Sequence, residues 1–286
     1  VTSNYGDQTT LEYLGKNQAS IAAVIIEPVQ SRNPDLQPFK FLQQLRGRAS
    51  SLDIPFILDE TITGFRTANG GINSILSLNA DIIVYGKMIG GGLPIGIVCG
   101  KSRFIDSVDG GASLIKEQNA RKTFSAGTFC KHPLAMASGL AVINQLIENG
   151  DALRTKVEQN TSNLCKELNS IFQRHQLPIE VVSFSSMFRF KYLGNSSYLF
   201  QSLDMDLFYL EMNYNGVFVW EGRTCFLSTT HQEKELSRII EAVETAATNV
   251  KDGGFFANNA ANKKHASTQP TLNQVDLTED QVEILA

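Results

Sequence analysis

The stretch IPFILDE (Ile54–Glu60) decides the fold, because this short apolar run ends on two adjacent acids. A second run, IIVYGK (Ile82–Lys87), ends in the same way on a glycine and a lysine. Further apolar runs occupy Ile21–Ile26 and Ile95–Cys99, and segments with helical spacing lie between the runs. Short apolar runs that alternate with amphipathic helices predict a mainly parallel sheet covered on both faces, which is an α/β architecture.

Composition places the chain among globular proteins. Of its 286 residues, 42% are apolar and 19% are charged, which is typical of a protein with a buried core. The formal net charge of −4 gives no electrostatic reason to expect binding to nucleic acid or to an anionic membrane. No apolar run approaches the about 20 residues that span a bilayer. The chain begins at Val1 without a leader, so we expect a cytoplasmic protein and a piece of a longer one.

Cysteine and histidine usage argues against a metal site and against a disulfide scaffold. The four histidines are dispersed, and the four cysteines contain no C-x-x-C pair. We therefore expect no metal cofactor. The cysteines are Cys99, Cys130, Cys165 and Cys225.

The pattern changes in the second half of the chain. A helix is predicted from about residue 132 to 147, with Pro133 in its first turn and Gly150 as its stop, followed by a second helix over 151–176. Beyond it we expect an α+β layout, with strands near 179–184, 187–190, 216–220 and 224–228 and helices near 203–213 and 232–249.

These changes predict three parts. Residues 1–150 form part of a large domain, and residues 151–250 form a smaller α+β domain. Residues 251–286 are polar and lack a sustained period, so they are predicted to be a linker and the start of a following domain.

The candidate chemistry lies at the ends of two predicted strands. Asp59 and Glu60 end one strand and Lys87 ends another, so we expect them to face one crevice at the carboxyl edge of the sheet. A lysine amine can form a Schiff base with an aldehyde, and a carboxylate can hold the proton of a ring nitrogen. Singly, the acids could be a helix cap, a turn or a magnesium site, and Lys87 a solvated side chain. The glycines of 90–92 imply a close backbone approach or positive φ angles.

Four motifs in order resemble class III aminotransferases, a family that includes ω-amino-acid aminotransferases and glutamate-1-semialdehyde aminomutase. They are IIEPV (Ile25–Val29), LDETITGFR (Leu58–Arg66), YGKMIGGGLPIG (Tyr85–Gly96) and AGTFCKHPLAMA (Ala126–Ala137). The resemblance implies the type I pyridoxal-phosphate transferase fold, with an incomplete large domain. It also implies pyridoxal 5'-phosphate as the cofactor.

The resemblance assigns roles to individual residues. Lys87 would form the Schiff base and move the proton, and Asp59 would pair with the pyridine nitrogen. Thr61 stands where the family commonly has a valine beneath the cofactor ring. Thr128 would donate its hydroxyl to the cofactor phosphate of a neighbouring subunit in a homodimer, and could also serve as a turn or cap before the next helix.

Two further expectations follow from the resemblance. Glu27 and Arg223 would form a substrate-gating pair, with a structural ion pair as the alternative. The family's phosphate-cradling loop and ring-stacking aromatic have no counterpart before Ile21. We therefore expect the 286-residue chain to bind the cofactor poorly by itself.

Two stretches narrow the resemblance. EPVQSRNPDLQP (Glu27–Pro38) and VWEGRTCFLSTTH (Val219–His231) are similar to aminotransferase domains of hybrid polyketide/non-ribosomal peptide synthetases, such as microcystin and nodularin synthetases. This implies transamination of a carrier-protein-tethered β-ketoacyl thioester to a β-amino acyl chain in toxin or lipopeptide biosynthesis, with glutamate or glutamine as amino donor. The alternatives are a stand-alone aminomutase or ω-aminotransferase, and a non-catalytic scaffold module.

Overall fold

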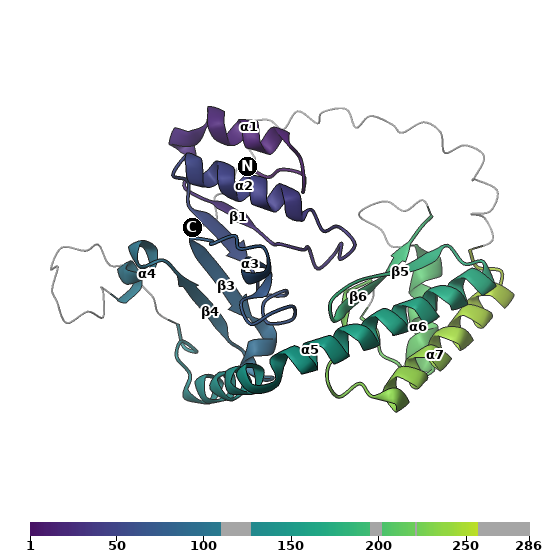
Figure 1. The fold of residues 1–286 in the computed structure, drawn as a ribbon. Coiled ribbons are helices and arrows are strands. Elements are labelled where there is room, and N and C mark those ends of the chain that lie inside the picture. The colour runs from purple at the N-terminus through teal and green to yellow at the C-terminus, as the bar shows by residue number, and fades with distance from the viewer. Residues whose placement is uncertain (110–126, 195–201, 221, 257–286) are drawn as a thin grey trace.

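The computed structural model describes residues 1–109, 127–194, 202–220 and 222–256. Two sheets are connected by one long helix, α5 (Figure 1). The elements are α1 (Thr9–Lys16), η1 (Gln18–Ser20), β1 (Val24–Ile26), α2 (Phe39–Ser51), β2 (Phe56–Asp59), α3 (Gly71–Ile75), β3 (Ile82–Gly86), η2 (Lys87–Gly90), β4 (Gly96–Gly100), α4 (Ser102–Asp109), α5 (Pro133–His175), β5 (Ile179–Phe184), β6 (Met187–Tyr192), α6 (Leu203–Tyr214), β7 (Cys225–Phe226) and α7 (Glu233–Asp252).

The first sheet has the strand order β1-β2-β3-β4. Strands β1, β2 and β3 are parallel, whereas β4 runs antiparallel to β3. The prediction of a mainly parallel sheet is therefore confirmed. The exception has a simple cause, because residues 87–95 are too few for the crossover of about a dozen residues that a parallel connection needs.

The described residues cover one face of this sheet. Phe56 and Leu58 of β2 are fully buried in a core that they share with side chains of α1 and α2. On the opposite face, Ile25 of β1 is 66% exposed and Val98 of β4 is 59% exposed. Among the described residues, the expectation of a sheet covered on both faces is thus met on one face only, and the other face is exposed and apolar.

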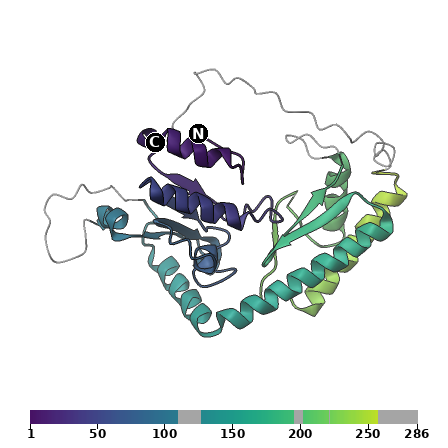
Figure 2. The same ribbon diagram turned by 45° about the horizontal axis from the view of Figure 1, so that its top comes forward.

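Helix α5 runs from Pro133 to His175 without a break, and it bends on its way from the first sheet to the second (Figure 2). Pro133 begins the helix as predicted, but the predicted stop at Gly150 is wrong. Gly150 is buried inside the helix, and a Cβ there would lie 2.7 Å from a guanidinium nitrogen of Arg154. Arg154 lies one turn further along the same helix and donates a hydrogen bond of 2.9 Å to Asn69 Oδ1. Glycine inside a helix costs only about 1 kcal/mol, so it does not by itself end α5.

The second sheet has the order β5-β6-β7 and is antiparallel. Its core contains an aromatic cluster in which Phe208 lies 5.5 Å from Phe172 and 5.6 Å from Phe190, measured between ring centroids. Most of the predicted α+β layout is confirmed, but the strand expected at 216–220 is wrong, since residues 217–220 have no regular structure. The division of the chain near residue 150 stays a prediction.

The predicted linker begins later than expected. Lys251 and Asp252 still belong to α7, and Phe256 is buried in the second core at 7% exposure. The remaining linker and the predicted start of a new element, residues 257–286, lie outside the described residues. Within the described part of the chain, no helix has the length and apolarity to cross a bilayer.

Candidate active site

The two acids at the end of β2 point to opposite faces of the sheet. Asp59 lies beside Val84 of β3 on the open face, and its Oδ1 accepts a hydrogen bond of 2.9 Å from the backbone N–H of Thr61. Glu60 is completely buried on the other face. The expectation that both acids face the crevice is therefore wrong for Glu60, because successive strand residues alternate between faces.

Glu60 holds the loop that follows β2. Its carboxylate accepts hydrogen bonds from the Thr63 hydroxyl at 2.5 Å and from the Asn73 N–H at 2.7 Å. Burial raises the pKa of Glu60 to about 7, although these hydrogen bonds act in the opposite direction. Gly71 has a φ of +61°, and a Cβ there would lie 2.4 Å from Glu60 Oε2. The loop can close over the carboxylate only because residue 71 is glycine.

Lys87 directly follows β3 and begins η2. Its φ of +55° is uncommon for a residue with a side chain, and such strained backbone collects at functional sites. The side chain is exposed, and its amine has no bonding partner in the part of the chain that the structure describes. A Cβ on the preceding Gly86 would lie 3.4 Å from Thr61 Cγ2. The structure thus brings Asp59, Thr61 and the backbone of Lys87 to one edge.

Helix α5 supports the turn that follows Lys87. Ser138 Oγ donates a hydrogen bond of 2.9 Å to the carbonyl of Gly90. Gly91 has a φ of +57°, and a Cβ there would lie 2.5 Å from the same hydroxyl. The predicted close backbone approach at these glycines is confirmed, and α5 holds the lysine turn in position.

Thr128 lies in an exposed turn ahead of α5. The residue that caps the helix is His132, whose side chain makes no capping hydrogen bond. The structure thus places Thr128 in the predicted turn without a capping role. Its contact with a cofactor phosphate stays a prediction.

Glu27 follows β1 and is partly buried near Asp59. Burial raises the pKa of Glu27 and the charge of Asp59 adds to the effect, whereas the hydrogen bond from the Ser31 N–H and the charge of Arg32 oppose it. No ion pair joins Glu27 to Arg223 among the residues described. Arg223 instead lies over the ring of Trp220, with 4.9 Å between the guanidinium carbon and the ring centroid. The structure does not bring this predicted pair together.

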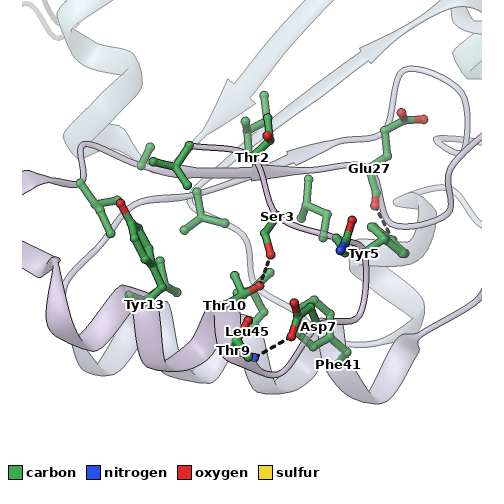
Figure 3. Close-up of a pocket in the computed structure, with 18 of the residues that line it drawn as sticks. Thr2, Ser3, Tyr5, Asp7, Thr9, Thr10, Tyr13, Glu27, Phe41 and Leu45 are labelled. Atoms are coloured by element: carbon green, nitrogen blue, oxygen red, sulfur yellow. Dashed lines mark hydrogen bonds between the residues drawn. The ribbon is translucent and has the colours of Figure 1, made fainter. Parts of the chain in front are cut away.

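A hollow of about 980 Å³ lies beside β1, between that strand and the N-terminal segment. Tyr5 lies at one end, on the side of Glu27 (Figure 3). Its hydroxyl lies 2.5 Å from the carbonyl oxygens of Glu27 and Pro28, and its one hydrogen is shared between them. Neither Asp59 nor Lys87 lines this hollow. It is therefore separate from the edge that carries the lysine.

The loop after Glu27 contacts the second sheet. Lys191 forms an ion pair of 2.6 Å with Asp35, and the Thr224 hydroxyl donates to the carbonyl of Ser31. Sequence reasoning did not find these contacts. It did single out the stretches 27–38 and 219–231, which hold Ser31, Asp35 and Thr224, so the motif content of these stretches was the available signal. Lys191 lies in neither stretch.

Comparison with known proteins decides the family. The sequence model described as Aminotransferase class-III matches residues 5–204. The chain belongs to the class-III aminotransferase family. This class-III aminotransferase chain is 31% identical over 240 residues to glutamate-1-semialdehyde 2,1-aminomutase of Archaeoglobus fulgidus, covering 81% of the chain and 54% of that protein. It is 32% identical over 248 residues to the enzyme of that name from Methanococcoides burtonii, covering 83% and 56%.

Solved structures confirm the type I fold for this class-III aminotransferase. An omega-transaminase from Sphaerobacter thermophilus superimposes with a TM-score of 0.76 at 23% identity, covering 88% of the chain and 57% of that protein. A structure described as a transaminase with PLP bound gives a TM-score of 0.75 at 25% identity, covering 89% and 58%. The chain spans about half the length of the curated relatives it matches.

The described residues contain no group of three or more His, Cys, Asp or Glu side chains that could hold a metal ion. The four cysteines are free thiols. The candidate site residues named from the sequence are a lysine, two carboxylates, two threonines and an arginine, namely Lys87, Asp59, Glu27, Thr61, Thr128 and Arg223.

Proposed function

We propose that the whole protein is a pyridoxal-phosphate-dependent aminotransferase. The observation that carries the proposal is the meeting of Asp59, Thr61 and Lys87 at one edge of a sheet whose adjoining face is open. The donor set fits the cofactor, because it combines an exposed primary amine with a carboxylate that accepts a single hydrogen bond from the described residues.

Each residue has a defined task in this proposal. Lys87 would bind the cofactor aldehyde covalently through Nζ and afterwards carry a proton to and from the substrate carbon. The Asp59 carboxylate would hold the proton of the pyridine nitrogen, and Thr61 orients that carboxylate through its N–H. When bound, pyridoxal phosphate supplies the electron sink that stabilises a developing carbanion.

Borohydride reduction followed by peptide mapping tests this assignment. Reduction makes the bond between a lysine and the cofactor aldehyde permanent, so even weak binding by the chain is captured. We expect the modification on Lys87, and we expect it to disappear in Lys87→Ala. Lys40→Ala, which removes an exposed lysine of α2, is the matched control and should leave the modification unchanged. Labelling spread over other lysines would refute the assignment.

We also propose a homodimer in which Thr128 reaches the cofactor phosphate of the partner. The N-terminal half of α5, next to Thr128, presents an unusually apolar surface. Leu134, Met136, Leu140 and Ile147 are 62%, 54%, 59% and 68% exposed. Met136, Leu140 and Ile147 recur at helical spacing and therefore share one face of α5, and an exposed apolar face of this kind is typical of an interface between subunits.

Sedimentation measurements test the dimer. The chain should sediment as a dimer, and Leu140→Glu should shift it to monomers because it buries a charge in the interface. Leu203→Glu is the matched control, since Leu203 is 69% exposed at the start of α6. A monomeric parent chain at all concentrations, or dimers that survive Leu140→Glu, would contradict the proposal.

For the substrate, we propose a β-ketoacyl thioester on a carrier protein, with glutamate as amino donor. This proposal rests on the two stretches 27–38 and 219–231, which contact each other through Ser31 and Thr224. The second candidate is a stand-alone aminomutase or ω-aminotransferase, which the names of the relatives favour.

Separate assays with two substrates distinguish the two candidate functions. The whole protein receives glutamate with either a carrier-bound β-ketoacyl chain or free glutamate-1-semialdehyde. Mass spectrometry of the carrier-bound chain should show replacement of the ketone oxygen by an amine. Turnover of glutamate-1-semialdehyde alone would refute the carrier substrate and support the aminomutase.

A further inference from the structure

Arg66 connects the loop after β2 to the second sheet. It lies in the loop after β2, and its Nε donates a hydrogen bond of 2.7 Å to the carbonyl of Ile62 in the same loop. A second guanidinium nitrogen donates at 3.0 Å to the hydroxyl of Ser186, between β5 and β6. The guanidinium carbon also lies 4.4 Å from the ring centroid of Phe226 in β7. One side chain therefore contacts its own loop and two elements of the second sheet.

The backbone is adapted to this contact on both sides. Phe65 has a φ of +64° and Ser185 has a φ of +52°, both in the left-handed region that residues with side chains seldom adopt. The Ser185 hydroxyl donates at 3.2 Å to the carbonyl of Arg66. Two strained turns, one from each sheet, thus meet at Arg66, and strain of this kind persists only where the surroundings hold it in place.

The contact is not an ion pair. Within the described ranges, no carboxylate lies within ion-pair distance of Arg66, and burial lowers the pKa of its guanidinium to about 10. The cation is instead bound by a carbonyl, a hydroxyl and an aromatic face. A planar guanidinium can satisfy these three partners together, whereas a lysine ammonium cannot.

We propose that Arg66 is a positioning residue that fixes the second sheet against the loop behind Asp59. Through Phe226, it sets the place of the segment that carries Arg223 relative to the edge with Lys87. The evidence for the contact between the sheets is the geometry of Arg66 and its partners. The inferred effect of this contact on catalysis rests on the proposed function.

Hydrogen exchange on the 286-residue chain tests the contact without any cofactor. Arg66→Met keeps the apolar stem and removes the guanidinium. We expect exchange to accelerate by about 10-fold at residues 60–73 and at Leu227, whose N–H bonds to the carbonyl of Ser186, since hydrogen bonds of charged groups are lost. Arg174→Met, a surface arginine paired with Glu244 within the second half, is the control and should leave both segments unchanged.

Two outcomes would overturn the contact proposal. One is an amide exchange rate in Arg66→Met that equals that of the parent protein. The other is a uniform acceleration of exchange that includes α7, because that pattern indicates global destabilisation rather than local loss of the contact between the sheets. Unfolding by urea adds a second criterion, since Arg66→Met and Ser186→Ala should have effects that are not additive. Additive effects would show that the two side chains do not act on each other.

A kinetic measurement separates this inference from the proposed function. In cofactor-loaded protein, Arg66→Met should retain the cofactor on Lys87 and raise the KM for the amino donor by about 10-fold, with partial recovery in Arg66→Lys. An unchanged KM would refute the positioning role. Absence of cofactor on Lys87 in the parent protein would refute the proposed function, while the exchange result would still decide the contact.

Discussion

Replacing Glu60 by glutamine should change how the stability of the protein depends on pH. Burial raises the pKa of Glu60 from 4.5 to about 7 in the folded chain. The folded state therefore holds the proton more tightly than the unfolded state, so stability is full below pH 4.5 and falls as the pH rises through about 7. At about 1.4 kcal/mol for each pKa unit, the loss is about 3 kcal/mol.

Glutamine imitates the protonated form of Glu60. Its carbonyl can accept the N–H of Asn73, and its amide can donate to the Thr63 hydroxyl, which is able to act as acceptor. The free energy of unfolding, measured with urea between about pH 4 and pH 8, should be similar for the two proteins at about pH 4, where Glu60 is protonated in both states. At pH 8, Glu60→Gln should be more stable by about 3 kcal/mol.

The difference between the two proteins isolates Glu60 from other groups, including Glu27, whose pKa burial also raises. Glu12→Gln removes a carboxylate that is 71% exposed in a surface ion pair, and should change the free energy by less than about 0.5 kcal/mol. A difference between Glu60→Gln and the parent protein that does not vary with pH would refute the reasoning, as would one of opposite sign.

Three further changes test the fold. Gly71→Ala should lower the free energy of unfolding by about 3 kcal/mol in urea titrations, because it combines a positive φ with a clash against Glu60. Asp81→Asn should cost about 3 to 5 kcal/mol at pH 7, since Asp81 pairs with Lys101 at 2.8 Å. Its pKa is lowered in the folded chain, so this penalty should shrink as the pH falls below the normal range of an aspartate, as acid titration would show. Phe208→Ala should lower the thermal unfolding midpoint and cost about 3 to 5 kcal/mol, because it empties the centre of the aromatic cluster.

The sequence predicted the elements whose signals are local. Apolar runs located β1 to β4, and an acid or lysine at a strand end located Asp59 and Lys87. The reversal of β4 was accessible in principle, because the connection at residues 87–95 is short, but apolarity alone does not give strand direction.

The features that the sequence did not predict depend on contacts between distant parts of the chain. Gly150 carries a helix-stop signal, yet it is buried inside α5, and Arg154 one turn further on bonds to Asn69 in the first half of the chain. Predicting the burial of Glu60 would have required knowledge of which face of β2 is covered by α1 and α2. Arg66 stood inside a quoted motif, yet its partners, Ser186 and Phe226, are far away in the chain. A contact between two segments that are far apart in the chain produces no hydrophobic periodicity in the sequence of either segment.

The pleat of β2 also fixes how the protein can change. Inserting or deleting one residue between Phe56 and Asp59 would rotate every later side chain of the strand to the other face. Asp59 would then point into the core instead of toward the open face, and an apolar side chain would replace it at the edge of the sheet. We therefore expect that the protein does not fold after a single-residue insertion or deletion in β2. Substitutions on the open face of this strand should destabilise the protein less.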